Sequence, residues 1–244
     1  MKLATLRDGG LDGRLVVVSR DVTRCSDARH VAPTLQAALD DWERVAPQLE
    51  LVARGVETGG QPVERFHERD AMAPLPRARG FATAWDGAAS LRREASEGFL
   101  GAREAVRVGG AGVEVRAGVA VVADDGTAVR LVMLALSVGE GAVFSPVAVT
   151  PDELGSAWDG ARLRGALSVA KGGASLGVFD VEGDFGELVD EAARGLALGA
   201  GAILGGRAVF RGEAAVGDAL RVEMRDAQGR TVFGAIEPRL DAGA

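Results

Sequence analysis

Short apolar runs separated by glycine and aspartate dominate the pattern along this chain, and they predict a protein built mainly of β-strands. Residues 2–6 and 14–19 flank Asp8-Gly9-Gly10, which predicts a hairpin near the start. Residues 219–224 and 231–236 flank Asp226–Gly229 and predict a second hairpin near the end. Further apolar or alternating runs predict strands at 113–122, 128–138, 143–149 and 163–169.

Helical spacing is confined to two stretches. Apolar residues recur every three or four positions between 35 and 49, with Pro33 where a first-turn proline is tolerated, and Pro47 either kinks or ends this helix. Asp184 and Glu187 have the spacing of a capping box, so a second helix begins there. Glycine and proline punctuate residues 55–80, which predicts a linker. Many strands and few helices predict an α+β, mainly β architecture.

Composition removes several classes of function. The net charge of −7 and the pI of about 5.0 disfavour a duplex-binding surface, so we expect no nucleic-acid partner. No apolar run approaches the ~20 residues of a membrane span, and the first residues reach Asp8 too early for a signal peptide. We therefore expect a cytoplasmic protein without a membrane partner, and the excess of Arg, Ala and Gly is typical of a GC-rich bacterial genome.

Candidate chemistry is sparse when judged from the residues alone. Cys25 is the single cysteine and the chain has two histidines, which leaves little material for a thiolate zinc site or a histidine-based triad. Asp124-Asp125-Gly126 could present carboxylates to a cation, but a turn between strands is favoured. Lys171 beside Gly172-Gly173 is better interpreted as a hairpin tip than as a presented lysine.

Several segments, in order along nearly the whole chain, resemble the fumarylacetoacetate hydrolase family, in particular its bacterial 2-keto-4-pentenoate and 2-oxohepta-3-ene-1,7-dioate hydratase-like members. The resemblance implies a small N-terminal α+β domain at 1–72 and a fumarylacetoacetate hydrolase-type β-roll domain at 73–244. It also implies pairing through the larger domain. The matching segments are 1–6 (MKLATL), 13–21 (GRLVVVSRD), 32–42 (APTLQAALDDW), 73–78 (APLPRA), 144–155 (FSPVAVTPDELG) and the hairpin at 217–236.

The family's active site does not carry over with these segments. Family members hold Mg²⁺ or Mn²⁺ with carboxylates, two of them from a Glu-x-Glu pair whose positions here are Arg116 and Gly118. The Asn-Asp that ends the next strand is replaced by Leu136 and Ser137. A guanidinium group in the site would repel the metal ion, because two unit charges ~4 Å apart interact by about 4 kcal/mol at an effective dielectric of ~20. The resemblance therefore implies no metal and no other cofactor for this chain.

Three other features of the family's site are also altered. The loop with its catalytic lysine is replaced by residues 139–142 (GEGA), and its substrate-binding Gly-Ser-Gly-Thr turn by 205–208 (GGRA). The segment 79–98, where the family places a metal-binding acid, is shortened. Because Glu114 shares a strand face with Arg116, shifting the alignment by two residues would restore one glutamate but not the second.

Two main hypotheses follow from this degenerate site. The first is a non-catalytic partner or scaffold subunit, a homodimer or a heteromer with an intact homologue. The second is a metal-independent enzyme on a small keto acid or dicarbonyl, and a small-molecule binding protein is a weaker third. In the second, Glu114 or Glu140 would supply acid–base chemistry, and Arg116, Arg207 and Ser137 would bind a small anionic ligand.

Overall fold

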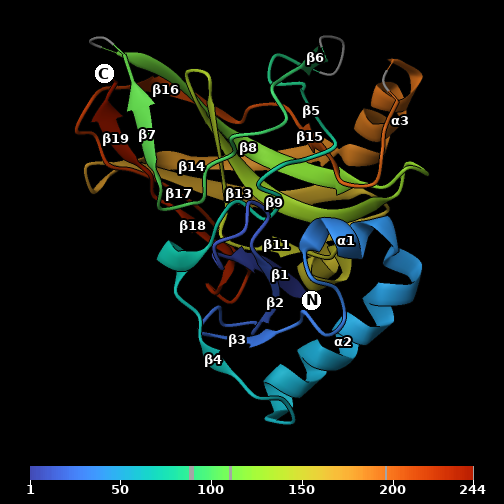
Figure 1. The fold of residues 1–244 in the computed structure, drawn as a ribbon. Helices are drawn as coiled ribbons and strands as arrows, with labels where there is room; N and C mark the ends of the chain where they lie inside the picture. The colour runs from blue at the N-terminus through green and yellow to red at the C-terminus, as the bar shows by residue number, and fades with distance from the viewer. Residues whose placement is uncertain (88–90, 110–111, 196, 244) are drawn as a thin grey trace.

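The elements of the protein are three α-helices, two short 3-10 helices and many strands within the residues described. The structure, a computed structural model, describes residues 1–87, 91–109, 112–195 and 197–243 (Figure 1). The helices are α1 (Leu35–Asp40), α2 (Trp42–Thr58) and α3 (Phe185–Gly195), with 3-10 helices η1 (Glu68–Asp70) and η3 (Pro151–Ala157).

One large sheet joins strands from both ends of the chain. Its path runs β4-β3-β2-β1-β11-β9-β8-β15-β5-β6, and β10 and β16 pair with β9 and β8. Lys2 and Leu3 pair with Val149 and Ala148, so strands on either side of residue 72 share this sheet; the domain boundary itself stays a prediction. The strands are β1 (Lys2–Leu6), β2 (Arg14–Val18), β3 (Arg24–Asp27), β4 (Glu64–Arg65), β5 (Gly80–Thr83), β6 (Arg92–Arg93), β8 (Val113–Ala123), β9 (Val129–Val138), β10 (Gly141–Phe144), β11 (Ala148–Val149), β15 (Ala202–Gly205) and β16 (Phe210–Ala214).

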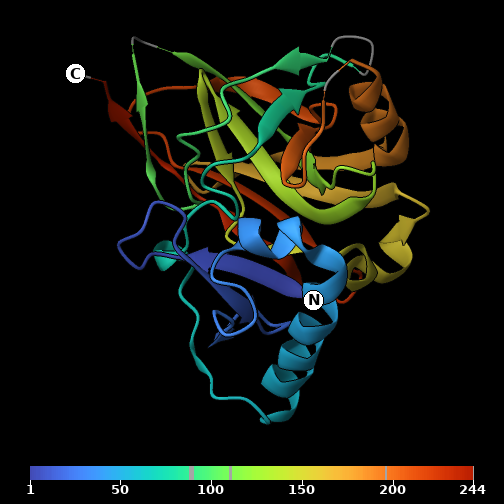
Figure 2. The same cartoon turned by 45° about the vertical axis from the view of Figure 1, so that its right-hand side comes forward.

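A second sheet packs against the large one and completes the β-roll. Its path is β12-β13-β17-β18, with β14 on the open side of β13. β19 and β7 form a separate parallel pair. Figure 2 shows the long strands β8 and β9 strongly curved, with the helices α1 and α2 below them. The bounds are β7 (Ala105–Val108), β12 (Trp158–Asp159), β13 (Arg162–Lys171), β14 (Ala174–Asp184), β17 (Leu220–Arg225), β18 (Thr231–Ile236) and β19 (Arg239–Ala242).

Both faces of the central strands are buried, which explains their continuous apolar runs. Along β8, Val119 and Val121 face the core between the two sheets, whereas Ala120 and Val122 face the core shared with α1 and α2. The α+β, mainly β prediction is confirmed. Among the described residues, no helix is both long and apolar enough to cross a membrane.

The predicted first helix is two helices. The backbone breaks at Asp41, with φ −139° and ψ 45°, and Thr34 rather than Pro33 caps the first piece by accepting a hydrogen bond from Ala37 N at 3.1 Å. Pro47 lies inside α2 and does not end it. The helix runs to Thr58 and ends at Gly59, whose φ of 78° suits glycine, so the first part of the predicted linker 55–80 is helical.

The predicted hairpins and turns are confirmed, with two differences in the strands. The 143–149 run is split into β10 and β11, because Pro146 has no N–H and the Ser145 hydroxyl instead bonds Leu134 N and Val147 O. Strand β14 was not predicted, because it alternates apolar with charged and glycine residues at an exposed edge. Asp124 accepts hydrogen bonds from Gly126 N, Ala128 N and Arg130 Nε, which is turn chemistry.

Candidate functional site

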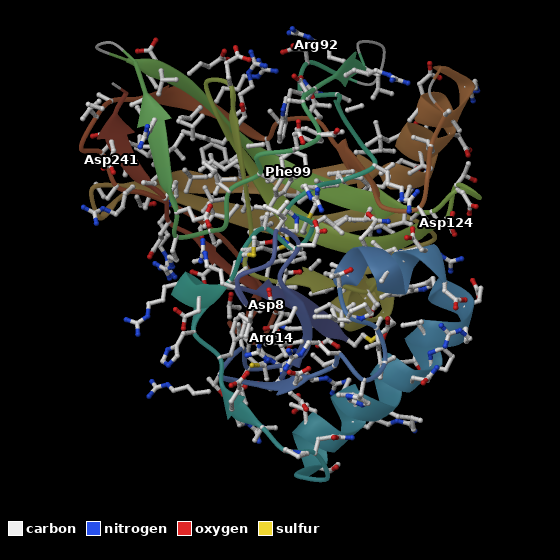
Figure 3. The ribbon with its side chains drawn as sticks, in the orientation of Figure 1. Asp8, Arg14, Arg92, Phe99, Asp124 and Asp241 are labelled. Carbon is white, nitrogen blue, oxygen red and sulfur yellow. The ribbon has the colours of Figure 1, made fainter. Side chains whose placement is uncertain are left out.

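Four of the five residues expected to form a site line one cavity of about 270 Å³ beside β8, which we call the β8 cavity. Glu114 and Arg116 come from β8, Ser137 from the end of β9, and Glu140 from the β9–β10 turn. In Figure 3, Arg92 marks the outer side of this region and Phe99 lies deeper in the molecule. Arg207 does not line this cavity: it follows β15 and its side chain is exposed.

Aromatic side chains close the inner side of the β8 cavity. Phe81, Phe99 and Phe144 pack edge to face, with ring centroids 5.1–5.8 Å apart. Edge-to-face contacts of this kind are favourable beyond the burial of area. The three rings are buried and tightly packed, so they limit the depth of the cavity.

Glu114 and Arg116 neutralise each other. They lie two residues apart on β8 and therefore on one face of the strand. Arg116 donates two hydrogen bonds of 2.8 Å to the Glu114 carboxylate, and Arg211 Nη1 lies 3.9 Å from the same group. The hydrogen bonds from Arg116 lower the pKa of Glu114 and raise that of Arg116. A carboxylate held ionised in this way is a weak general base at neutral pH.

Trp85 occupies the space beside Gly118. A Cβ at position 118 would lie 2.9 Å from Trp85 Cζ3, closer than real Cβ contacts, and 3.1 Å from Arg207 O, which is a tight contact. The tryptophan is 6% exposed, and its carbonyl accepts hydrogen bonds from Ala208 N at 3.2 Å and Arg211 Nη2 at 2.7 Å. Position 118 therefore has room for glycine only, unless Trp85 moves.

The remaining residues of the expected site contribute little acid–base chemistry. Ser137 pairs with Arg116 across the β8–β9 ladder and donates its hydroxyl to Gly139 O at 3.2 Å. Leu136 is buried. Glu140 is exposed at the turn, and no ion pair of its side chain is found within the described residues. The geometry brings Glu140 to the rim of the cavity without a positioning partner.

Sequence reasoning missed three charged residues of this cavity, all in the shortened segment 79–98, of which residues 88–90 lie outside the described part. Arg92, Glu94 and Glu97 also line the wall, and Glu94 accepts a hydrogen bond from the Thr83 hydroxyl at 2.9 Å. With Glu114, Glu140 and Arg116, the wall carries four carboxylates against two guanidinium groups, a formal charge of −2. This balance disfavours a small anion in the β8 cavity.

Cys25 is not part of this site. It lies on β3, is fully buried, and its thiol donates to Glu64 Oε1 at 3.8 Å. Burial and the neighbouring Glu64 raise the pKa of the thiol to about 12, so the reactive thiolate is scarce at neutral pH.

Comparisons with known proteins agree with this fold. Residues 1–77 match the family model of the fumarylacetoacetase N-terminal domain 2. Over its whole length the chain superposes on the maleylpyruvate hydrolase of Sphingobium sp. SYK-6, with a TM-score of 0.75, 15% identity and complete coverage of both chains. Residues 1–77 therefore match a fumarylacetoacetase N-terminal domain, and the chain as a whole has the fold of the fumarylacetoacetate hydrolase-type structures.

Other solved structures of this fold are enzymes or are named as such. A putative HpcE protein of Mycobacterium smegmatis has a TM-score of 0.69 at 17% identity, covering 99% of this chain and 100% of the other. A probable 2-hydroxyhepta-2,4-diene-1,7-dioate isomerase of Mycobacterium abscessus has a TM-score of 0.69 at 15% identity, with both chains fully covered. No curated protein sequence matches the chain. The fumarylacetoacetate hydrolase fold is therefore retained at low identity.

The residues of the β8 cavity do not fit the divalent cation expected of members of the family. The maleylpyruvate hydrolase is known with manganese(II) and pyruvate. At the two positions that the sequence comparison predicts for the family's acids, Arg116 is paired with Glu114, and Trp85 lies against Gly118. Across residues 1–87, 91–109, 112–195 and 197–243, no three His, Cys, Asp or Glu side chains converge as a metal site would require. We derive no catalytic step through a metal.

Proposed function

We propose that this chain is a fumarylacetoacetate hydrolase-family protein that has lost the metal-dependent reaction and acts as a partner or scaffold subunit. The observation that carries the proposal is the pair of substitutions on β8. A guanidinium–carboxylate pair and a glycine beneath Trp85 stand where the family presents two acids. Hard divalent cations need several oxygen ligands, mostly charged, and this wall does not converge them.

An exposed strand edge supports the partner role. Strand β14 pairs with β13, and within the described residues no strand covers its other edge. Val178, which is 68% exposed, and Leu176 present apolar side chains along this strand. Long edges with apolar side chains favour pairing with another chain. The partner is a second copy of this chain or an intact homologue.

Cation binding tests the loss of the metal site. We expect millimolar Mn²⁺ or Mg²⁺ to leave the melting temperature unchanged relative to a buffer without divalent cations and of equal ionic strength. We also expect no hydrolysis of maleylpyruvate. The Sphingobium maleylpyruvate hydrolase is the positive control for both readouts. A saturable rise in melting temperature with Mn²⁺ would reject the proposal, because only a ligand bound to the native state stabilises it in this way.

The oligomeric state tests the partner role. Light scattering after gel filtration measures the mass of the wild-type chain, alone and with an intact homologue. Val178→Lys places a charge on the β14 edge and is expected to dissociate the assembly. Leu51→Lys, an exposed leucine on α2, is the matched control and should leave the mass unchanged. A monomer under every condition contradicts the partner role.

A metal-independent enzyme is the second candidate, and the observation that favours it is the open β8 cavity. Ser137, Glu140 and Arg116 share its wall, so a small dicarbonyl substrate could meet a carboxylate and a guanidinium there. Turnover of keto acids or dicarbonyls in the presence of a chelator, abolished by Glu140→Gln, would support this candidate. Turnover that survives Glu140→Gln would remove the residue from the reaction.

A further inference from the structure

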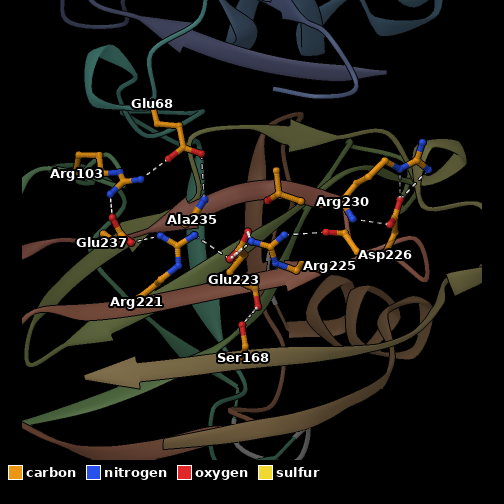
Figure 4. Close-up of polar contacts among 12 residues, drawn as sticks. Glu68, Arg103, Ser168, Arg221, Glu223, Arg225, Asp226, Arg230, Ala235 and Glu237 are labelled. Carbon is orange, nitrogen blue, oxygen red and sulfur yellow. Dashed lines mark hydrogen bonds and ion pairs between the residues drawn. The ribbon is translucent and has the colours of Figure 1, made fainter. Parts of the chain in front are cut away.

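A second cavity of about 560 Å³ lies on another side of the molecule, and neither proposed function uses it. It is bounded by the start of β1, by η3, by β13 and by the β17–β18 hairpin. We call it the Lys2 cavity after the lysine on its wall. Figure 4 shows part of its rim, where Arg225, Asp226 and Arg230 lie on the hairpin.

Lys2 is a buried cation without a carboxylate partner. Its side chain is 4% exposed, and Nζ donates to Val232 O at 2.6 Å and to Thr231 O at 3.0 Å. An ammonium group has three N–H donors, so one remains after these two bonds. Among the described residues, no carboxylate lies within ion-pair distance of Nζ. A buried charge without a counter-ion is costly, so an anion beside it would be stabilising.

The Thr231 hydroxyl is a second, independent sign of a missing ligand. Its Oγ1 is buried and has no hydrogen-bond partner, although Thr231 itself lines the Lys2 cavity. Buried hydroxyl groups almost always have a partner. The same residue accepts from Lys2 Nζ through its carbonyl, so the orphaned hydroxyl and the ammonium group lie on one stretch of backbone.

The charges around the rim are paired, with one exception. Arg230 bonds Asp226 at 2.8 Å and Arg225 bonds the buried Glu223 at 3.0 Å (Figure 4). Arg20 lies 3.5 Å from Glu153. Asp152 is the other acid of the wall, and its side chain is 77% exposed, which weakens its repulsion of an anion. Arg164 on β13 lines the cavity and has no ion pair within the described residues.

The wall therefore carries a positive excess in an acidic protein. Five basic side chains face three acidic ones, a formal charge of +2 on a chain whose total is −7. Two of the basic groups, Lys2 and Arg164, have no carboxylate of their own. A cationic or neutral ligand would leave both groups uncompensated.

We propose that the Lys2 cavity binds a small oxyanion, a phosphate or carboxylate group, through the Lys2 ammonium and the Thr231 hydroxyl, with Arg164 at its mouth. The oxyanion accepts the third N–H of Lys2 and the O–H of Thr231, which satisfies both orphaned donors. Charge-assisted hydrogen bonds of this kind are about twice as strong as neutral ones. The remaining volume accommodates an organic group that carries the anion.

Thermal shift with simple anions is the first test. Inorganic phosphate and acetate, each titrated against sodium chloride of equal ionic strength, are the probes. We expect a saturable rise in melting temperature with at least one of them, and the stronger of the two identifies the oxyanion class. Shifts equal to those of chloride would overturn the proposal, because that result means ionic screening only.

Substitutions of residues that line the Lys2 cavity test whether the rise in melting temperature comes from binding there. Lys2→Met keeps the length of the side chain and is expected to weaken the affinity for the anion at least tenfold. Thr231→Val keeps the shape of the side chain and is expected to weaken this affinity about threefold. Lys171→Met is the matched control, because Lys171 is the other lysine of the chain and lies outside this cavity. Equal losses in Lys2→Met and Lys171→Met would overturn the assignment.

Lysine NMR decides the question even if Lys2→Met does not fold. A chain with ¹³Cε-labelled lysine gives two signals, one for each lysine. Desolvation lowers the pKa of Lys2 to about 8, while Glu153, Asp226 and Asp21 raise it and Arg230 lowers it. A bound anion is expected to raise this pKa by at least half a unit while the Lys171 signal is unchanged. No difference between the titrations with and without the anion contradicts the proposal.

Discussion

The β8 cavity and the Lys2 cavity differ in whether their central charged groups are ion-paired. In the β8 cavity, Glu114 and Arg116 hold each other in a two-bond pair near solvent. In the Lys2 cavity, the central cation is buried and bonded only to carbonyl oxygens. The first arrangement leaves little unpaired charge that a ligand could bind. The second leaves an N–H donor and a positive charge that a ligand could bind.

The contrast shows that unpartnered polar groups do not have to lie where the family's active site is expected. Strand β8 has its apolar run and pairs with β9, while Arg116 on this strand bonds Glu114 and Trp85 lies against Gly118. Conserved architecture positions backbone atoms, while binding depends on which side chains remain without partners.

The largest expected effect is a pH dependence of stability caused by Lys2. Burial lowers its pKa from 10.5 to about 8, so the folded state binds this proton less tightly than the unfolded state. The penalty is fully present below pH 8 and is relieved as the pH rises toward 10.5. Relative to Lys2→Met, the free energy of unfolding should therefore increase by about 3 kcal/mol over this window. Urea unfolding at each pH measures this difference.

Cys25 must be removed from that comparison, because its effect has the opposite sign. The pKa of its thiol is raised from 9.0 to about 12, so the unfolded chain loses this proton first and stability falls above pH 9. Both chains are therefore compared in a Cys25→Ala background. A flat difference between them from pH 7.5 to 10.5 would show that Lys2 titrates normally.

The next effect concerns the buried glutamate behind the Lys2 cavity. Glu223 is 5% exposed and accepts hydrogen bonds from Arg221 and Arg225, within a network that continues to Glu237, Arg103 and Glu68 (Figure 4). Glu223→Gln removes the negative charge between two cations and should cost about 2 kcal/mol in the free energy of unfolding. A loss below about 0.5 kcal/mol would mean that these ion pairs contribute no more than ordinary surface ion pairs.

Much of the strand framework could be predicted, because period and turn chemistry are local. The Asp226–Gly229 hairpin and the start of α3 at Asp184 follow from a few neighbouring residues, and Glu187 N does bond Asp184 Oδ1 at 3.0 Å. The break at Asp41 was missed because the helical spacing of apolar residues continues across it. The β14 edge was missed because exposed strands carry a weak alternation.

Only the part of the site that lies on neighbouring strands could be predicted. Glu114, Arg116 and Ser137 meet because β8 and β9 are adjacent, and this follows from the sequence. The contact of Trp85 with Gly118 depends on the parallel pairing of β5 with β15, which joins residues about 120 positions apart and has no local signal. Lys2 is hidden for a similar reason, since every residue of β1 is buried and the strand shows no polar face.

A smaller effect tests whether Trp85 closes the β8 cavity at Gly118. Gly118→Ala adds a Cβ that would meet Trp85 Cζ3 at 2.9 Å, so overpacking should cost about 1–2 kcal/mol. In a Trp85→Leu background the same substitution should cost clearly less, because the ring is gone, although Arg207 O remains near. Equal costs in the two backgrounds would mean that the ring yields without strain.

The smallest effect is expected from the Glu114–Arg116 ion pair on β8. Glu114 and Arg116 form their two hydrogen bonds beside solvent, and Glu114 is exposed. A double-mutant cycle of Glu114→Gln and Arg116→Gln should give a coupling of about 0.5 kcal/mol that shrinks with added salt. Circular dichroism during urea unfolding, at low and at high salt, measures it. A coupling above 2 kcal/mol would mean that the pair is a structural element of β8, and that its presence stabilises the fold rather than marking a vacated metal site.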